Sequence, residues 1–286
     1  MRQNINEFVL ICPRNDEEAL QILKIAKKIC LPVVISQQPH GAKLDKEPNL
    51  LSRIQEANPE ACNVVIVELP GLKTEDELRK QGYELVIIDH HRYEETDRSN
   101  DKSSLHQFLK FMQISDSDLR DLGFDPEMVH AVAIMDAEFI WGLQKRGFSN
   151  DAIVKILNYW RKLTLELGDK RRQKEENEAK KVWQNRQEKG DLIIVKSNED
   201  NISIRDALSF LLAQTYGKPK PLYIRQGNRR VYMQDVGRRV AEKLHEQFGG
   251  FLFGQNKCWG ILVDDSESLP TLEEILEAIQ GIPWQT

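Results

Sequence analysis

Four short apolar runs mark the first 90 residues of the chain, at positions 8–11, 33–35, 64–67 and 85–88. Runs of this length that are rich in β-branched residues are typical of strands buried on both faces of a parallel sheet. Between the first two runs, acidic residues at 16–18 are followed by apolar residues at helical spacing up to Ile29, and Pro32 then ends the helix. The pattern predicts a doubly wound α/β unit.

Downstream of this unit the apolar periodicity becomes helical, and it predicts helices at 103–113, 116–122, 126–146 and 150–163. Residues 169–189 carry eight Lys or Arg and five Asp or Glu, with almost no apolar residue. This segment indicates either a solvated helix that bridges two domains or a flexible linker, and the absence of Gly and Pro within it favours the helix.

A second set of alternating elements follows the charged segment. Apolar runs predict strands beginning at 191, 222 and 260, and helical spacing predicts helices near 204–215 and 235–247. The expected fold is therefore α/β: a parallel-sheet N-terminal domain over 1–165, a charged linker helix over 166–190, and a smaller α/β C-terminal domain over 191–286.

Composition narrows the class of protein without naming its function. The 286 residues suffice for about two domains, and a net charge of −5 does not by itself hold a protein to nucleic acid or to a membrane. We find neither an apolar run of roughly 20 residues nor a signal-peptide core. The four cysteines form no CxxC pair, so neither a zinc ribbon nor a disulfide framework is indicated. A cytoplasmic protein is expected.

Polar side chains follow three of the four predicted strands of the first domain. In an open parallel sheet, ligands bind beyond the carboxyl ends of the strands, so these side chains are expected at one edge. They are Cys12, Asp16 and Glu18 after the first strand, Glu68 after the third, and Asp89, His90 and His91 after the fourth. Carboxylates with imidazoles suit Mn²⁺, Mg²⁺ or Fe²⁺ better than structural zinc.

In these residues the chain resembles the DHH superfamily of phosphoesterases. Its name-giving triplet stands at a strand end as Asp89-His90-His91, and its first motif, His-x-x-x-Asp-x-Asp, is matched over residues 12–18 with Cys12 for His and Glu18 for the second Asp. The Asp that ends the second motif is replaced by Glu68. The fourth motif, an Asp inside an apolar helix, is matched by Asp136. The four motifs occur in the family's order, and the resemblance covers about the first 165 residues.

The resemblance implies hydrolysis of a phosphoester or phosphoanhydride bond with two metal ions, as in RecJ-type exonucleases and pAp phosphatases. Two divalent cations can hold the attacking and leaving oxygens of an in-line displacement. By the resemblance the metal ligands are Cys12, Asp16, Glu18, Glu68, His90 and Asp136, with Glu68 bridging two Mn²⁺ or Mg²⁺ ions. Asp89, His90 and His91 form the catalytic triplet, in which Asp89 and His91 orient the ligands or contact phosphate.

The departures from the family pattern leave two functions open. The family's C-terminal signature, which ends in Gly-Gly-His, appears here as Gly249-Gly250-Phe251. One hypothesis is an active enzyme with altered metal preference, since each replaced metal ligand keeps a side chain that can bind metal. The other is an inactive relative that binds nucleic acid or a protein partner.

A basic segment of the C-terminal domain is the candidate surface for substrate. Residues 216–239 hold seven Lys or Arg against one Asp, with Tyr223 and Tyr232 interleaved, a combination that permits phosphate contacts beside base stacking. A solvated charged face is the alternative. The expected substrate-binding residues are Arg225, Arg229, Arg230, Gly249 and Gly250, facing the metal site across an interdomain cleft. The expected partner is a nucleotide or short single-stranded nucleic acid and not a membrane, and a homodimer is left open.

Overall fold

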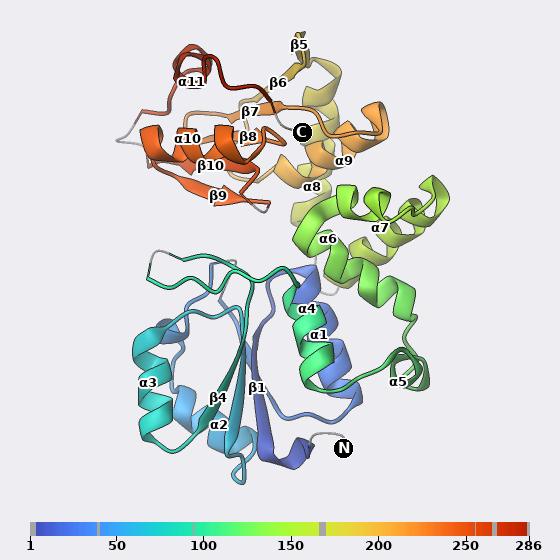
Figure 1. Ribbon diagram of the computed structural model, residues 1–286, viewed down its shortest axis with the longest axis vertical. Coiled ribbons are helices and arrows are strands. Elements are labelled where there is room, and N and C mark those ends of the chain that lie inside the picture. Colours follow the sequence, from blue (N-terminus) through green and yellow to red (C-terminus); the bar gives the residue numbers. More distant parts are fainter. Residues whose placement is uncertain are drawn as a thin grey trace. The chain divides into compact units, whose positions relative to one another are not determined.

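The chain folds into two compact units (Figure 1). The computed structural model describes residues 4–38, 41–93, 95–165, 170–254, 256–264 and 268–284. Unit 1 comprises Met1–Ala137 and Gly142–Leu167, and unit 2 comprises Glu138–Trp141 and Gly168–Thr286. Within the described ranges, no helix has the length and apolar character that crossing a bilayer requires.

Unit 1 is built on a four-stranded parallel sheet in the order β2-β1-β3-β4. The strands are β1 (Phe8–Pro13), β2 (Val33–Ser36), β3 (Asn63–Val67) and β4 (Glu84–Ile88). Each contains one of the four apolar runs, so the predicted α/β class and its parallel sheet are confirmed. The apolar runs lack alternation because both faces of the sheet are covered.

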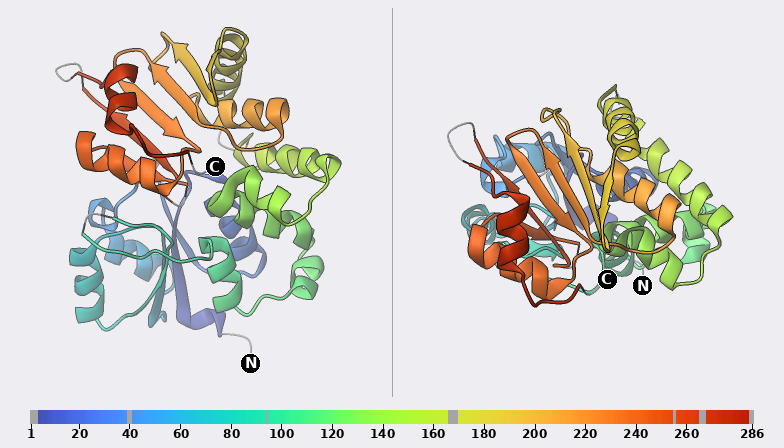
Figure 2. Two further views of the ribbon diagram at one scale, coloured as in Figure 1. Left: turned by 45° about the horizontal axis from the view of Figure 1, so that its top comes forward. Right: turned by 90° about the horizontal axis from the view of Figure 1, so that it is seen from above.

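Helices cover the two faces of this sheet (Figure 2), and alternate residues of β1 belong to different core clusters. Leu10 and Cys12 pack in one cluster with α1 (Glu17–Lys28) and α4 (Ser104–Phe111). Val9 and Ile11 pack in the opposite cluster. That second layer contains α2 (Leu50–Ala57) and α3 (Leu72–Lys80), and short 3₁₀ turns η1 (Ile5–Glu7) and η2 (Leu44–Lys46) complete this part of the chain.

Three further helices extend the α1 side of unit 1: α5 (Asp116–Asp121), α6 (Pro126–Lys145) and α7 (Asn150–Leu165). The sequence predicts an uninterrupted helix over 126–146, but α6 breaks at Phe139, which has φ 56° and ψ −160°. A positive φ is strained for a bulky residue. The Phe139 ring lies 5.0 Å from that of Phe210, and Trp141 packs against a core cluster of unit 2. This packing within unit 2 accounts for the break.

Unit 2 contains a six-stranded mixed sheet in the order β5-β6-β7-β8-β10-β9, in which only β6 and β7 run parallel. Its strands are β5 (Gln187–Lys189), β6 (Leu192–Ser197), β7 (Leu222–Gln226), β8 (Arg230–Gln234), β9 (Phe251–Phe253) and β10 (Cys258–Leu262). The sequence did not predict β5, β8 or β9. Strands β5 and β9 are three residues long, and β8 begins within the basic segment that was interpreted as a surface.

Two helices cover each face of this sheet. On one face lie α10 (Arg238–Phe248) and α11 (Leu272–Ala278), and on the other lie α8 (Lys170–Gln184) and α9 (Arg205–Tyr216). Helix α8 carries most of the charged segment, yet it is not solvated on every side. Its Ala179, Val182 and Trp183 are buried in the cluster beneath α9, and Ser197 donates a hydrogen bond to Glu178. Three small or apolar positions at helical spacing therefore attach α8 to unit 2, in contrast to the solvated bridging helix that the composition favoured.

Backbone packing between β9 and β10 requires a glycine at position 250. Its φ is +81°, and a Cβ built on it would lie 2.3 Å from the carbonyl oxygen of Gly260. We therefore expect Gly250→Ala to lower the free energy of unfolding of unit 2 by about 2 kcal/mol. Gly217→Ala is the matched control, because Gly217 also has a positive φ but no atom within 4 Å of the added methyl. Equal losses in urea denaturation of the two variants would contradict this interpretation.

Candidate metal centre

The topology of unit 1 brings the candidate ligands to the carboxyl ends of the strands. The strand order reverses between β1 and β3, and such a switch point opens a crevice beyond the strand ends. Glu18 lies in the first turn of α1 after β1, Glu68 follows β3 directly, and His90 comes two residues after β4. Asp136 reaches the same place from α6.

His90 stands at the centre of these carboxylates. Its Nε2 atom lies 2.9 Å from Oδ2 of Asp136, 3.3 Å from Oε1 of Glu68 and 4.0 Å from Oε2 of Glu18. One ligand atom from each of the four residues can be chosen so that all lie within 4.8 Å of one another. The backbone N–H of Leu105 donates to the other oxygen of Glu18 at 2.8 Å, which holds that carboxylate in place.

These four side chains are largely buried, and burying three carboxylates together is unfavourable in free energy unless a cation lies among them. The side chain of Glu18 is 1% exposed, that of Glu68 11% and that of His90 12%. The distances allow ion pairs, but Oε2 of Glu18, Oε1 of Glu68, Nε2 of His90 and Oδ2 of Asp136 have no hydrogen bond of acceptable geometry to any described residue. Buried polar atoms that converge without hydrogen bonds are the expected cradle of a metal ion. The residues therefore fit a divalent cation with mixed oxygen and nitrogen ligands.

The charges of the cluster are strongly coupled. Burial lowers the pKa of His90, but the close carboxylates of Asp136 and Glu68 outweigh this effect and raise it to about 10. Burial, together with the neighbouring Asp136 and Glu68, raises the pKa of Glu18. Burial alone would raise the pKa of Glu68 as well, but His90 and His91 hold it below its usual value. The raised pKa thus places a positively charged imidazole among these carboxylates at neutral pH.

This charge distribution predicts that metal binding releases a proton from His90, because a ligating imidazole must give up the proton it holds up to about pH 10. Raising the pH removes the competing proton, so each unit between about pH 6.5 and 8.5 should strengthen Mn²⁺ binding by up to about tenfold. Calorimetric titrations in two buffers of different ionisation enthalpy measure the released proton. His90→Gln should flatten the pH dependence, and a pH-independent wild-type affinity would refute the assignment.

Asp89 organises the loop that carries both histidines, and it is itself 3% exposed. Its Oδ1 atom accepts from the backbone N–H groups of His90 at 2.8 Å and His91 at 3.0 Å. Tyr93 donates its hydroxyl to the same carboxylate, and Arg98 lies 3.7 Å from it. Asp89 is thus saturated with partners and acts as a positioning residue for the loop.

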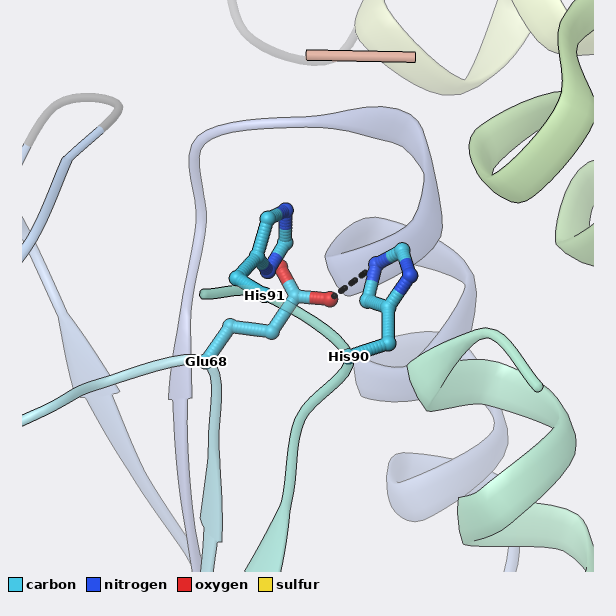
Figure 3. A group of neighbouring side chains, drawn as sticks. All are labelled: Glu68, His90 and His91. Atoms are coloured by element: carbon cyan, nitrogen blue, oxygen red, sulfur yellow. Dashed lines mark ion pairs between the residues drawn. The ribbon is translucent and has the colours of Figure 1, made fainter. Parts of the chain in front are cut away.

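The His91 side chain also contacts Asp89, through Nδ1, and its Nε2 atom is directed away from that contact. Its Nδ1 atom lies 3.1 Å from Oδ1 of Asp89, and the side chain is 42% exposed. Figure 3 shows the Glu68 carboxylate between the two imidazoles, with the ion pair to His90 drawn. Glu68, His90 and His91 form a second group of close ligand atoms. Glu68 and His90 thus belong to both groups.

Glu68 adopts an uncommon backbone conformation, with φ 49°. Its N–H donates to the carbonyl of Ile88 at 3.0 Å, so the residue stays tied to the sheet while its chain direction turns. A left-handed non-glycine residue costs on the order of 1 kcal/mol or more and persists where its surroundings enforce it. Such strain at a carboxylate that faces two imidazoles is consistent with a functional position.

The other two predicted ligands lie nearby in different roles. Asp16 caps α1, and its Oδ1 atom accepts from the backbone N–H of Ala19 at 2.8 Å. Cys12 is fully buried in the core cluster of α1 and α4, and burial followed by the charges of Asp16, Glu68 and Glu18 raises the pKa of its thiol. Among the described residues, neither joins the two groups of close ligand atoms. Their ligation stays a prediction.

The basic segment of unit 2 is divided by its strands. Arg225, Arg229 and Arg230 lie near the turn between β7 and β8, whereas its other basic residues precede β7 or follow β8. Because each strand is five residues long, the three arginines near the turn lie about 13 Å from the basic residues at the far ends of β7 and β8. Arg229 and Arg230 line a hollow of about 300 Å³, and Arg225 lines another of about 560 Å³. Acidic residues interrupt this surface, as Asp264 lies 3.8 Å from Arg229.

Gly249 and Gly250, the remaining predicted substrate residues, have backbone roles. Gly249 ends α10, and its carbonyl accepts from the indole N–H of Trp259 at 2.8 Å. Gly250 permits the close approach of β9 and β10. Substrate binding by these glycines and by the three arginines stays a prediction.

Sequence reasoning missed the residues that hold the Asp89 loop. Arg98 pairs with Asp89 and with the buried Glu75, and Gln107 donates to the backbone carbonyl of Asp89 at 2.8 Å. The signal for Arg98 was weak, because one arginine in a polar loop resembles any solvated side chain. The burial of Glu75 could not be recognised either, because it is one of several charged residues in α3.

The comparisons with known proteins give structural likenesses only. No family model and no curated protein sequence matches the chain. The pGpG-specific phosphodiesterase PggH from Vibrio cholerae superposes with a TM-score of 0.46 at 13% identity, over 91% of this chain and 95% of that one. The exonuclease RecJ bound to manganese gives 0.41 at 12%, over 93% and 91%. A protein from Helicobacter pylori G27 gives 0.34 at 12%, over 96% and 98%.

Proposed function

We propose that the protein is a divalent-metal-dependent phosphoesterase that hydrolyses a nucleotide or a short nucleic acid. The observation that carries the proposal is the convergence of Glu18, Glu68, His90 and Asp136 on one point, with four buried polar atoms that lack hydrogen bonds within the described part of the chain. Three carboxylates beside one imidazole form an oxygen-rich set that suits Mn²⁺ or Mg²⁺. Their place beyond the strand ends of an open sheet is a usual place for a ligand.

The two overlapping groups of ligand atoms are the reason for proposing two ions. Glu18, His90 and Asp136 would hold one ion together with Glu68, the Glu68 carboxylate could also reach a second ion, and His91 lies beside that second position. When bound, a pair of divalent cations lowers the pKa of water and neutralises the charge that develops on a transferring phosphoryl group. The side chains of the chain hold and orient this centre, and the low exposure of Glu18 and Glu68 limits bulk water around it.

His91 is the proposed contact for the substrate phosphate. Burial lowers its pKa, but the hydrogen bond to Asp89 and the charge of Glu68 raise it above the usual histidine value. A larger fraction of the imidazole is then protonated near neutral pH, and its exposed edge can donate to a phosphate oxygen. Asp89 fixes the ring through Nδ1 and thereby sets which nitrogen faces the substrate.

The substrate class rests on the DHH-like motifs and on the arginines of unit 2. Arg225, Arg229 and Arg230 lie close in sequence around one turn, and guanidinium groups bind phosphates in a bidentate manner. We propose that they contact the phosphates of the substrate. The acidic residues among them favour a short nucleotide over a long polyanion, because a mixed surface gives weaker non-specific attraction.

A substrate panel tests the proposed function. Purified protein with Mn²⁺ or Mg²⁺ should release product from at least one of short oligonucleotides, dinucleotides, pAp and pyrophosphate, and His90→Ala should abolish the release. His245→Ala is the control, because this exposed imidazole lies in α10 of unit 2. Metal binding without hydrolysis of any of these, together with binding of an oligonucleotide, would favour an inactive binding module.

A further inference from the structure

Two histidines of unit 1 meet outside the candidate metal centre. His106 lies on α4 and His130 on α6. Nε2 of His106 is 3.3 Å from Nδ1 of His130, and the two rings are stacked with centroids 5.4 Å apart. The sequence gives no motif for this pair, because 24 residues and α5 separate its members.

The separation of the two nitrogens fits a shared tetrahedral metal ion. Zinc binds imidazole nitrogen at about 2.0–2.1 Å, and a tetrahedral angle then places two such nitrogens about 3.3 Å apart. The observed separation of 3.3 Å between Nε2 of His106 and Nδ1 of His130 equals this expected nitrogen–nitrogen distance. A metal ion can therefore be shared without a change in the separation of the two nitrogens.

Asp116 supplies the second observation that points to a metal ion. Its Oδ1 atom lies 2.8 Å from Nε2 of His130, and a carboxylate accepts, so Nε2 carries the hydrogen. This leaves the Nδ1 lone pair of a neutral His130 directed at His106. A carboxylate that fixes the tautomer of a ligating histidine is the usual support of such ligands, and Asp89 makes the same contact with His91.

Nε2 of His106 is the ring atom that faces Nδ1 of His130. Imidazole nitrogen without a carboxylate ligand suits Zn²⁺, Ni²⁺ or Cu²⁺ better than Mn²⁺ or Mg²⁺.

We propose that His106 and His130 form a second metal site, specific for Zn²⁺ over Mg²⁺, in which Asp116 orients His130 and water completes the coordination. The site goes beyond the proposed hydrolysis, because it uses none of the residues of the carboxylate centre. It joins α4, whose Leu105 N–H holds Glu18, to α6, which carries Asp136. Bound Zn²⁺ stabilises this packing, since a ligand that binds only the folded state shifts unfolding.

Zinc stoichiometry of matched variants tests the site. Equilibrium dialysis against Zn²⁺ with metal analysis should find one ion fewer per chain in His106→Gln and in His130→Ala than in the wild type. Asp116→Asn should keep the ion but weaken its binding by about 10–100-fold. His245→Ala, which removes an imidazole elsewhere, should match the wild type.

A crystal soaked in Zn²⁺ locates the ion directly. The expected result is an anomalous peak between Nε2 of His106 and Nδ1 of His130. No peak there, or unchanged stoichiometry in both histidine variants, would overturn the proposal. Circular dichroism melting of each variant separates loss of the site from loss of the fold, and His106→Gln keeps a polar side chain at that half-buried position to preserve packing.

Discussion

Replacing Asp136 with asparagine should lower kcat/KM for metal-dependent hydrolysis about a thousandfold, which corresponds to about 4 kcal/mol of transition-state stabilisation. The amide keeps the size of the side chain but removes one of the negative charges that surround Nε2 of His90. Mn²⁺ affinity should fall with it, because a neutral amide oxygen is a weaker ligand for a hard cation than a carboxylate. Steady-state kinetics on the substrate found in the panel, at increasing Mn²⁺, measure both effects.

Asp121→Asn is the matched control for this experiment. Asp121 ends α5 of the same unit and is exposed, so the same chemical change should leave kcat/KM within about twofold of the wild type. If Asp136→Asn retained wild-type kinetics at every Mn²⁺ concentration, the assignment of Asp136 as a ligand would be wrong.

Asp89→Ala should lower the free energy of unfolding of unit 1 by about 3–5 kcal/mol, because it removes one partner from a buried charge network. The substitution leaves the Arg98 guanidinium with Glu75 alone, and it deprives the N–H groups of His90 and His91 of their acceptor. Hydrolysis should also decrease, since both imidazoles lose their orientation. Urea denaturation measures the first effect.

Asp97→Ala separates this loss from a general effect of removing charge. Asp97 belongs to the same loop region, but its side chain is 58% exposed and its contact with Arg92 is 3.7 Å long. An exposed ion pair contributes less than about 1 kcal/mol. Equal destabilisation by the two substitutions would show that Asp89 is not the organising residue of the loop.

Much of unit 1 could be predicted because its strands and its ligand-bearing loops depend on residues that lie close together in the sequence. Four β-branched runs define the strands, and polar residues at the strand ends define the edge where ligands meet. The convergence of Glu18, Glu68 and His90 follows from parallel strand order. Asp136 was identifiable because a carboxylate inside an apolar helix is costly without a partner. The roles of Arg98 and Gln107 depend on tertiary contacts, so no local pattern reveals them.

Unit 2 was harder to predict for two physical reasons. Strands β5 and β9 are too short for alternation to be recognised, and Arg230 begins β8 within a segment whose charge suggested a surface. Helix α8 shows the same limit, because its buried apolar residues Ala179, Val182 and Trp183 are few within a charged segment. The break at Phe139 depends on contacts with Phe210, which lies far away in the sequence.

The most direct test of the central claim is a crystal structure grown with Mn²⁺ and recorded at the manganese absorption edge. We expect an anomalous peak bound by Glu18, Glu68, His90 and Asp136, with Nε2 of His90 turned onto the ion. A map without a peak at these four residues, in which Nε2 of His90 instead lies 2.9 Å from Asp136 as in the structure described above, would contradict it.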